Sequence, residues 1–122
     1  MKSLVLIFAG GGLGSVIRFL LSRWVTGLHQ LNFPLGTLAV NVVACFVLGV
    51  VVGLADHKQL LSPDSRIFWT IGFCGGFSTF STFSYETLVL FQQPAVASGL
   101  LYVVASVAMC LAATVLGVWV GR

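Results

Sequence analysis

The chain has 122 residues, of which 58% are hydrophobic and only 7% are charged. Soluble domains carry about 25% charged residues, so this chain cannot cover itself with a water-facing surface and must have lipid as its main solvent. The net charge of +3 does not indicate a nucleic-acid partner, because the basic residues are expected at helix ends, where they set membrane topology.

Long stretches without charge locate the membrane spans. Residues 24–55, 67–85 and 87–121 contain no Asp, Glu, Lys or Arg, and a helix crosses a bilayer with about 20 mostly apolar residues. We predict an all-α integral membrane protein, a single transmembrane domain over residues 1–122, with four spans at about residues 4–25, 35–55, 67–91 and 95–120. Short joints that contain Pro34, Pro63 or Pro94 make consecutive helices antiparallel neighbours.

The first two spans contain small and polar residues at four-residue spacing, which places them on one helix face. Gly10 and Gly14 in the first span form a small-xxx-small pair that favours close helix packing. The stripe in the second span consists of Thr37, Asn41, Cys45, Gly49 and Gly53. Its glycines are interpreted as packing residues, whereas the carboxamide of Asn41 either bonds across a helix interface or faces a polar path.

The third span holds the strongest signal, the segment Gly-Phe-Cys-Gly-Gly-Phe-Ser-Thr-Phe-Ser-Thr-Phe at residues 72–83. Each Gly of Gly75-Gly76 costs a helix about 1 kcal/mol relative to Ala, and the Ser and Thr side chains that follow offer alternative backbone bonds. We therefore predict a break near mid-membrane, at about residues 75–79. Transporters use such breaks to bind ions, and the exposed carbonyls would suit a small hard cation such as Na⁺.

The fourth span carries another polar stripe at four-residue spacing, formed by Ser98, Tyr102, Ser106, Cys110 and Thr114. Such hydroxyls commonly bond carbonyls of their own helix, so this stripe alone is weak evidence for a polar path. It becomes suggestive only together with the stripe of the second span. Cys45, Cys74 and Cys110 show no metal-site spacing and are interpreted as small packing residues. No pair of nucleophile and base indicates an enzyme.

The chain resembles the Fluc (CrcB) family of fluoride channels over its whole length. The resemblance rests on the segment at residues 72–83, on Gly10-Gly11-x-x-Gly14-Ser15-x-x-Arg18-Phe19, and on an Asn in the second span. It implies passive, fluoride-selective export from the cytoplasm across the bacterial inner membrane. It also implies an antiparallel, dual-topology homodimer with two pores and a structural Na⁺ at its centre.

The resemblance also assigns residue roles. The backbone carbonyls of Gly75 and Ser78 would hold Na⁺, Arg18 would serve an aqueous vestibule, and Phe80 and Phe83 would line the fluoride path beside Asn41. The further path residues would be Thr37, Ser81, Thr82, Glu86, Tyr102 and Ser106. Physically, a small anion needs donors to replace its water, and the positive edges of aromatic rings add attraction without a fixed charge.

Four alternatives stay open from the residues. Arg18 could instead snorkel to the membrane interface, and Glu86 could be a satisfied carboxyl without a role in conduction. A small dimeric, proton-coupled multidrug exporter would also have four spans, although it would need a carboxylate in its first span, which this chain lacks. A structural assembly subunit would explain the glycines but not the third span.

Overall fold

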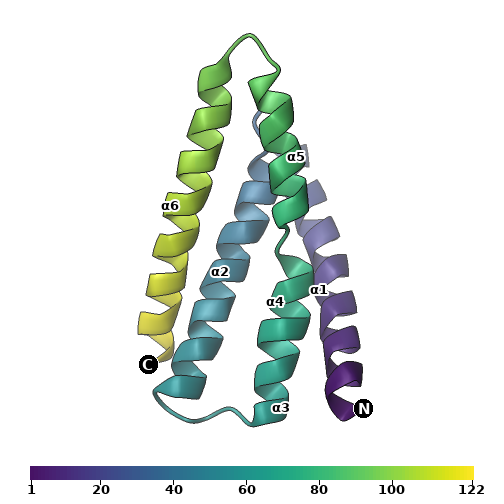
Figure 1. Ribbon diagram of the computed structural model, residues 1–122, viewed down its shortest axis with the longest axis vertical. Coiled ribbons are helices and arrows are strands. Elements are labelled where there is room, and N and C mark those ends of the chain that lie inside the picture. The colour runs from purple at the N-terminus through teal and green to yellow at the C-terminus, as the bar shows by residue number, and fades with distance from the viewer.

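The computed structural model describes residues 1–122, and every regular element is a helix (Figure 1). Three helices are long and apolar enough to cross a membrane: α1 (Lys2–Gly27), α2 (Leu35–Asp56) and α6 (Val96–Gly121). The residues between α2 and α6 form the shorter elements α3 (Pro63–Arg66), the π-helical η1 (Ile67–Phe73), α4 (Cys74–Phe77) and α5 (Phe80–Phe91). The protein is therefore an all-α, multi-pass membrane protein.

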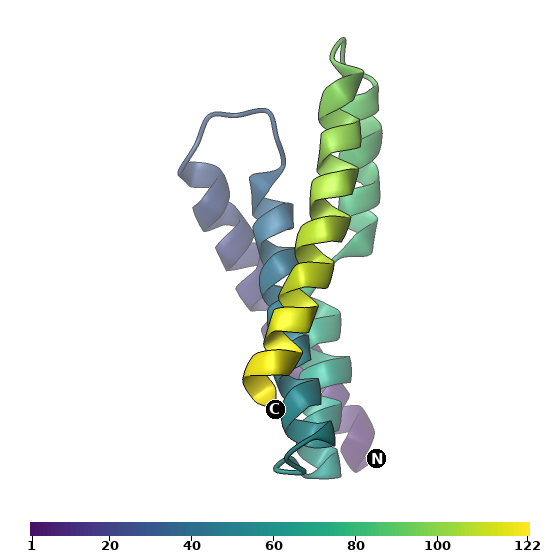
Figure 2. The same ribbon diagram turned by 90° about the vertical axis from the view of Figure 1, so that its left-hand side faces the viewer.

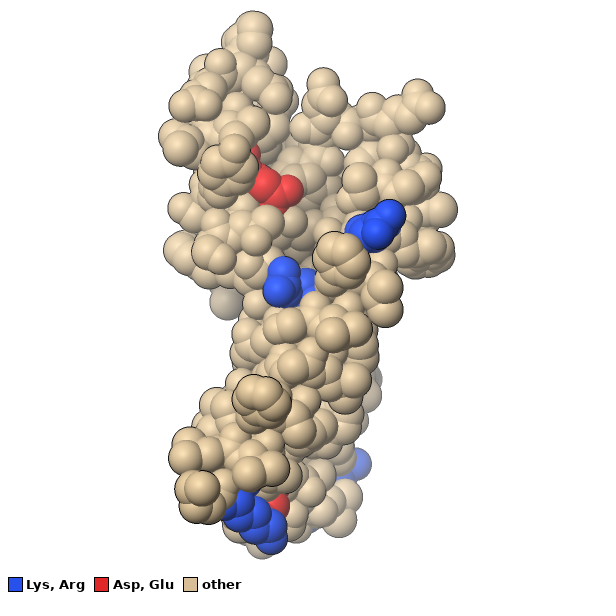
Figure 3. Space-filling view, turned by 90° about the vertical axis from the view of Figure 1, so that its right-hand side faces the viewer, with Lys and Arg blue, Asp and Glu red and all other residues tan.

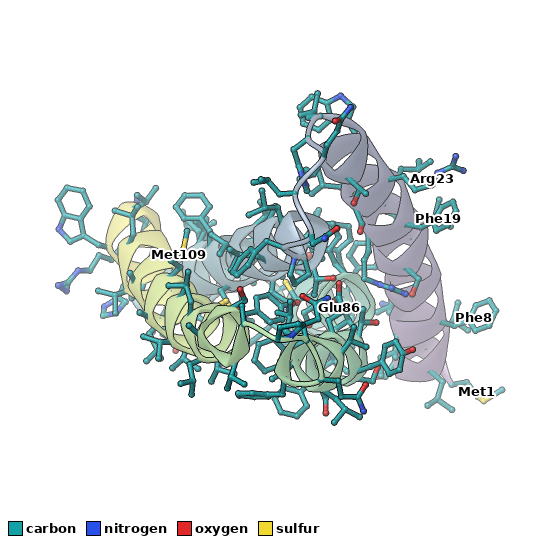
Figure 4. All side chains as sticks on the ribbon, turned by 90° about the horizontal axis from the view of Figure 1, so that it is seen from above. Met1, Phe8, Phe19, Arg23, Glu86 and Met109 are labelled. Carbon is teal, nitrogen blue, oxygen red and sulfur yellow. The ribbon has the colours of Figure 1, made fainter.

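The outer surface of α1 is apolar, as a lipid-facing surface requires. Phe8 is 83% exposed, and Figure 4 shows Phe8 and Phe19 pointing away from the other helices. A surface of this kind is unstable in water but suits a hydrocarbon solvent. The polar side chains that remain inside the bundle therefore need a structural or functional reason.

The expected third span, residues 67–91, is divided into two helical pieces. The run from α3 through η1 to α4 ends at Phe77, and α5 begins at Phe80. Ser78 has φ −79° and ψ 157°, and Thr79 has φ −147° and ψ 114°, so both residues are extended. Figure 1 shows this connection as a short non-helical segment between α4 and α5.

The glycines Gly75 and Gly76 lie inside α4 and not in the interruption, so they are not the cause of the break that their helix propensity predicted. A Cβ at Gly76 would lie 2.3 Å from the Gly11 carbonyl oxygen, so glycine is required there for close packing on α1. The interruption falls instead on Ser78 and Thr79, whose side chains bond nearby backbone groups.

Glycine pairs set the main helix contacts, which confirms the packing role predicted for them. A Cβ at Gly14 would lie 2.3 Å from the Phe73 carbonyl oxygen, which places α1 directly against η1 and α4. A Cβ at Gly49 would lie 2.4 Å from the Thr114 carbonyl oxygen, and one at Gly53 would lie 2.6 Å from that of Val118. Because both numbers rise together, α2 and α6 run parallel.

The bundle is closed at one end and open at the other. Near the termini, α2, α4 and α1 lie close together, whereas α5 and α6 separate from the α1–α2 connection at the opposite end (Figure 2). Two small cores hold the arrangement. One comprises Val40, Ala44, Phe73, Cys74 and Phe77, and the other comprises Leu38, Leu90 and Tyr102.

Candidate functional site

Asn41 of α2 binds the interruption between α4 and α5. Its Oδ1 accepts a hydrogen bond from the Thr79 N–H at 2.8 Å, and its Nδ2 donates to the Thr79 carbonyl at 3.1 Å. The carboxamide oxygen thus replaces the backbone acceptor that the Thr79 N–H loses when α4 stops, and the carboxamide N–H adds a donor to the Thr79 carbonyl. The structure therefore contains the bonding across a helix interface, one of the two roles left open for Asn41.

The same bonds free two carbonyls at the end of α4. In a continuous helix the Thr79 N–H would bond the Gly75 carbonyl, but it is taken by Asn41. The Thr82 N–H would bond the Ser78 carbonyl, but it donates to Thr79 Oγ1 at 3.2 Å. Gly75 and Ser78 are both exposed in the single chain. Two free carbonyl oxygens at a helix C-terminus form a donor set that fits a small hard cation such as Na⁺.

A third carbonyl of α4 is covered by α1. Arg18 Nε donates to the Gly76 carbonyl at 3.1 Å, and Ser15 Oγ donates to the same oxygen at 3.4 Å. The Arg18 guanidinium therefore lies at the negative end of α4, where a cation is favoured by the helix dipole. Arg18 is half-buried, and its side chain has a bonding partner inside the bundle.

A cavity of about 280 Å³ lies beside the interruption, between α2, α5 and α6. Asn41, Ser106, Phe80 and Phe83 are among the residues that line it. The ring centroids of Phe80 and Phe83 are 5.6 Å apart, and Phe80 is 79% exposed on the open side of the cavity. No charged residue lines this cavity.

Two hydroxyls near this cavity are buried without a hydrogen-bond partner. Ser106 Oγ belongs to a side chain that lines the cavity, and Ser106 is only 6% exposed. Tyr102 is fully buried, its ring lies 5.1 Å from that of Phe83, and its hydroxyl also lacks a partner. Buried polar atoms are nearly always satisfied, so the Ser106 hydroxyl is available to bind water or an ion. The Tyr102 hydroxyl lies beside Thr37 and Glu86.

Glu86 lies on the other side of Tyr102. Its Oε1 accepts a hydrogen bond of 2.5 Å from Thr37 Oγ1, and its side chain lines a second cavity of about 320 Å³ near the α1–α2 connection. Figure 4 shows Glu86 between the helices and not on the lipid-facing side, and Figure 3 shows acidic and basic side chains around a hollow in this half of the molecule.

The comparisons with known proteins agree along the whole chain. The model of a family described as CrcB-like protein, Camphor Resistance (CrcB), matches residues 5–118. The chain belongs to the CrcB-like family. A relative from Phocaeicola vulgatus, named fluoride-specific ion channel FluC, is 44% identical over 122 residues, which is 100% of both chains. Relatives of the same name from Geobacter sulfurreducens and Rhizobium johnstonii are 44% and 42% identical, over 100% of this chain and 98% of each relative.

Within this CrcB-like chain, the nine residues predicted for the fluoride path divide into three groups. The structure brings four of them to one cavity: Asn41, Phe80, Phe83 and Ser106. It places Thr37 and Tyr102 beside the side-chain carboxylate of a third predicted residue, Glu86. The last two, Ser81 and Thr82, lie in the first turn of α5 and do not line the cavity.

Sequence reasoning missed Thr79, which the structure makes the central residue of the interruption. Its backbone binds Asn41, and its hydroxyl accepts the Thr82 N–H as the N-cap of α5. A Thr directly before an apolar helical segment is an N-cap signal. That signal was available in the sequence, and it places the start of α5 at Phe80.

Proposed function

We propose that this protein is a fluoride-selective channel that lets fluoride leave the cytoplasm passively. The observation that carries the proposal is the cavity beside Thr79, which combines an amide, a buried free hydroxyl and two phenyl rings without a fixed charge. The FluC names of the full-length relatives support fluoride as the ion. The protein is then a channel and not an enzyme.

The hydrogen-bond donors of this cavity can replace the water that a small anion loses when it enters the membrane. Moving an unpaired ion from water into an apolar medium costs tens of kcal/mol in a simple solvation estimate. Asn41 has two N–H donors and uses one for Thr79, so the second is free for an anion. The Ser106 hydroxyl adds another donor, and the edges of Phe80 and Phe83 carry partial positive charge. None of these groups holds the ion as a fixed cation would, so the ion can leave.

The break in the third span would place helix ends at this point of the membrane. The N-terminus of α5 starts beside the cavity, and the positive end of its dipole favours an anion there. The C-terminus of α4 presents the free carbonyls of Gly75 and Ser78, which favour a cation. In this arrangement the broken helix lies at mid-membrane, as in transporters with discontinuous helices.

The assembly is proposed to be an antiparallel, dual-topology homodimer with two pores in the bacterial inner membrane. Gly75, Ser78 and Phe80 are exposed together in the single chain, and a second copy would cover them. The Gly75 and Ser78 carbonyls of both copies would then hold a central Na⁺. When bound, the ion would neutralise the carbonyl dipoles and join the two subunits.

Beyond the cavity, the path is proposed to continue past Tyr102 to Thr37 and Glu86. The hydroxyl of Tyr102 lies beside the Glu86 carboxylate, to which Thr37 donates a hydrogen bond. Ser81 and Thr82 would extend the polar lining on the side that a second copy covers. Arg18 would attract anions into the vestibule while it remains bound to the Gly76 carbonyl.

Fluoride efflux tests the proposal directly. Purified protein is reconstituted into liposomes loaded with potassium fluoride, and external fluoride is recorded with an electrode after addition of a potassium ionophore. We expect rapid efflux of fluoride, at a rate that does not saturate with fluoride concentration, and no efflux of chloride. Phe80→Ile and Phe83→Ile should reduce the efflux while gel filtration shows unchanged assembly. Unaltered efflux in both variants would remove the rings from the path.

The exporter alternative receives no support from the structure. A proton-coupled exporter needs a carboxylate in its first helix, and α1 contains none. The only acidic side chain near the membrane interior is Glu86, which is occupied by Thr37. Proton-coupled uptake of an organic cation by the same liposomes, with no fluoride movement, would reverse this conclusion.

A further inference from the structure

The parallel packing of α2 and α6 brings two cysteines of this chain together. Gly49 lies against Thr114, and the next contact on the same face pairs Gly53 with Val118. One helical turn before Gly49 on α2 is Cys45, and one turn before Thr114 on α6 is Cys110. The register therefore places Cys45 and Cys110 beside each other across the α2–α6 contact, and both line the same cavity.

Both cysteines are free and both line the 280 Å³ cavity. Cys45 lies one turn beyond Asn41 on α2, and Cys110 lies one turn beyond Ser106 on α6. The thiol pair is thus the next layer of the same wall that carries the amide and the free hydroxyl. Both residues are half-buried, so the cavity connects them to the outside.

We propose that Cys45 and Cys110 form a binding site for a soft divalent metal cation of the Hg²⁺ type, and that the bound metal obstructs the cavity. Thiol sulfur is the ligand that soft metals select, and Hg²⁺ is satisfied by two sulfur ligands in a line. Each sulfur releases its proton to water as it binds the metal. Two thiolates and one divalent cation form a neutral complex, which a low-dielectric site tolerates far better than a charged one.

The remaining lining distinguishes this metal from harder ones. The cavity offers no carboxylate and no imidazole, and its oxygen groups come from neutral side chains such as Asn41 and Ser106. Zn²⁺ requires about four ligands in tetrahedral geometry, so the pair is too small a set for it. The site therefore discriminates between Hg²⁺ and Zn²⁺. The third cysteine, Cys74, lies in a separate core with its Sγ 3.9 Å from the Ala44 carbonyl oxygen.

Metal binding is tested on the full-length protein in detergent, in a Cys74→Ser background that contains only the thiol pair. The protein is incubated with Hg²⁺, separated from free metal by gel filtration in a competing dilute thiol, and analysed for metal per chain. We expect one Hg²⁺ per chain, bound through both thiols. Cys45→Ser and Cys110→Ser should each weaken retention by a factor on the order of 10²–10⁴, because the second ligand no longer acts at high effective concentration. Zn²⁺ should not be retained.

Several results would overturn the site. Two Hg²⁺ per chain would mean independent thiols, no bound metal would mean inaccessible thiols, and equal retention in either single variant would exclude bridging. Circular dichroism and gel filtration establish that each variant is folded, and Cys45→Ala or Cys110→Ala replaces a serine variant that fails this check.

That the bound metal obstructs the cavity rests on the proposed function, so it is measured in a separate assay. Fluoride efflux is recorded with and without Hg²⁺, and the efflux of each variant with Hg²⁺ is divided by its own efflux without metal. We expect Hg²⁺ to abolish most of the efflux of wild type and Cys74→Ser, with recovery in dithiothreitol, and to leave most of it in Cys45→Ser and Cys110→Ser. Bound metal with unchanged efflux would refute the obstruction. A protein that binds Hg²⁺ but never conducts fluoride would refute the proposed function and leave the metal site intact.

Discussion

Replacing Asn41 with Ala removes the side chain that completes the interrupted helix. Two hydrogen bonds disappear, from the Thr79 N–H to Oδ1 at 2.8 Å and from Nδ2 to the Thr79 carbonyl at 3.1 Å. Leaving a buried donor or acceptor without a partner costs about 1–3 kcal/mol per group. Ser78 and Thr79 are extended, so the Thr79 N–H has no helical carbonyl to return to, and we expect a loss of about 2–4 kcal/mol of stability for the two bonds.

Conduction should fall as well, because the second amide N–H of Asn41 is lost from the cavity. One hydrogen bond to an ion contributes about 1.5–3 kcal/mol, which corresponds to roughly a 10–100-fold decrease in rate if the bond is made at the barrier. Asn41→Asp is a more specific variant, because the Asp side chain has the same size as that of Asn. Its carboxylate still accepts the Thr79 N–H, but it adds negative charge beside the path and should abolish fluoride efflux.

The assay combines thermal unfolding in detergent with fluoride efflux from liposomes. Gln30→Ala is the control, since Gln30 lies exposed in the α1–α2 connection and a carboxamide is deleted there away from both cavities. Wild-type unfolding and efflux in Asn41→Ala would refute both roles. A loss of efflux without a loss of stability would refute the bonding to Thr79 and leave only the contact with the ion.

Three further predictions concern other contacts. Gly76→Ala forces a Cβ to within 2.3 Å of the Gly11 carbonyl oxygen and should lower the unfolding temperature by overpacking worth about 1–3 kcal/mol, whereas Gly12→Ala, with nothing within 4 Å, should leave it unchanged. Thr37→Val removes the 2.5 Å bond to the neighbouring carboxylate and should reduce efflux about 10-fold with assembly unchanged in gel filtration; wild-type efflux would exclude this bond from the path. Replacing Na⁺ by a large organic cation during purification should weaken the dimer, as measured by subunit exchange, and equal exchange rates in the two salts would contradict a structural Na⁺.

The membrane class and much of the candidate site could be predicted from local patterns. Apolar length determines a span, and the four-residue stripes place Asn41 and Ser106 on faces of α2 and α6. The segment at residues 72–83 marks the third span as unusual because its glycine and hydroxyl content disfavours an undisturbed helix. The position of the interruption was harder to predict. Gly75 and Gly76 carried the local signal, but both lie inside α4, where Gly76 packs against α1 and Gly75 is exposed.

The sequence by itself determined which segments enter the membrane, because transfer from water to lipid is a sum over each segment's own side chains. Only the tertiary structure decided what the polar groups inside those segments do. Asn41 lies 38 residues from Thr79 in the chain and yet supplies its backbone partners. Cys45 faces Cys110 only because α2 and α6 run parallel, in the register that their glycines allow. Such contacts depend on how distant helices approach each other, and that distance is set by packing along the whole interface and not by any short stretch of residues.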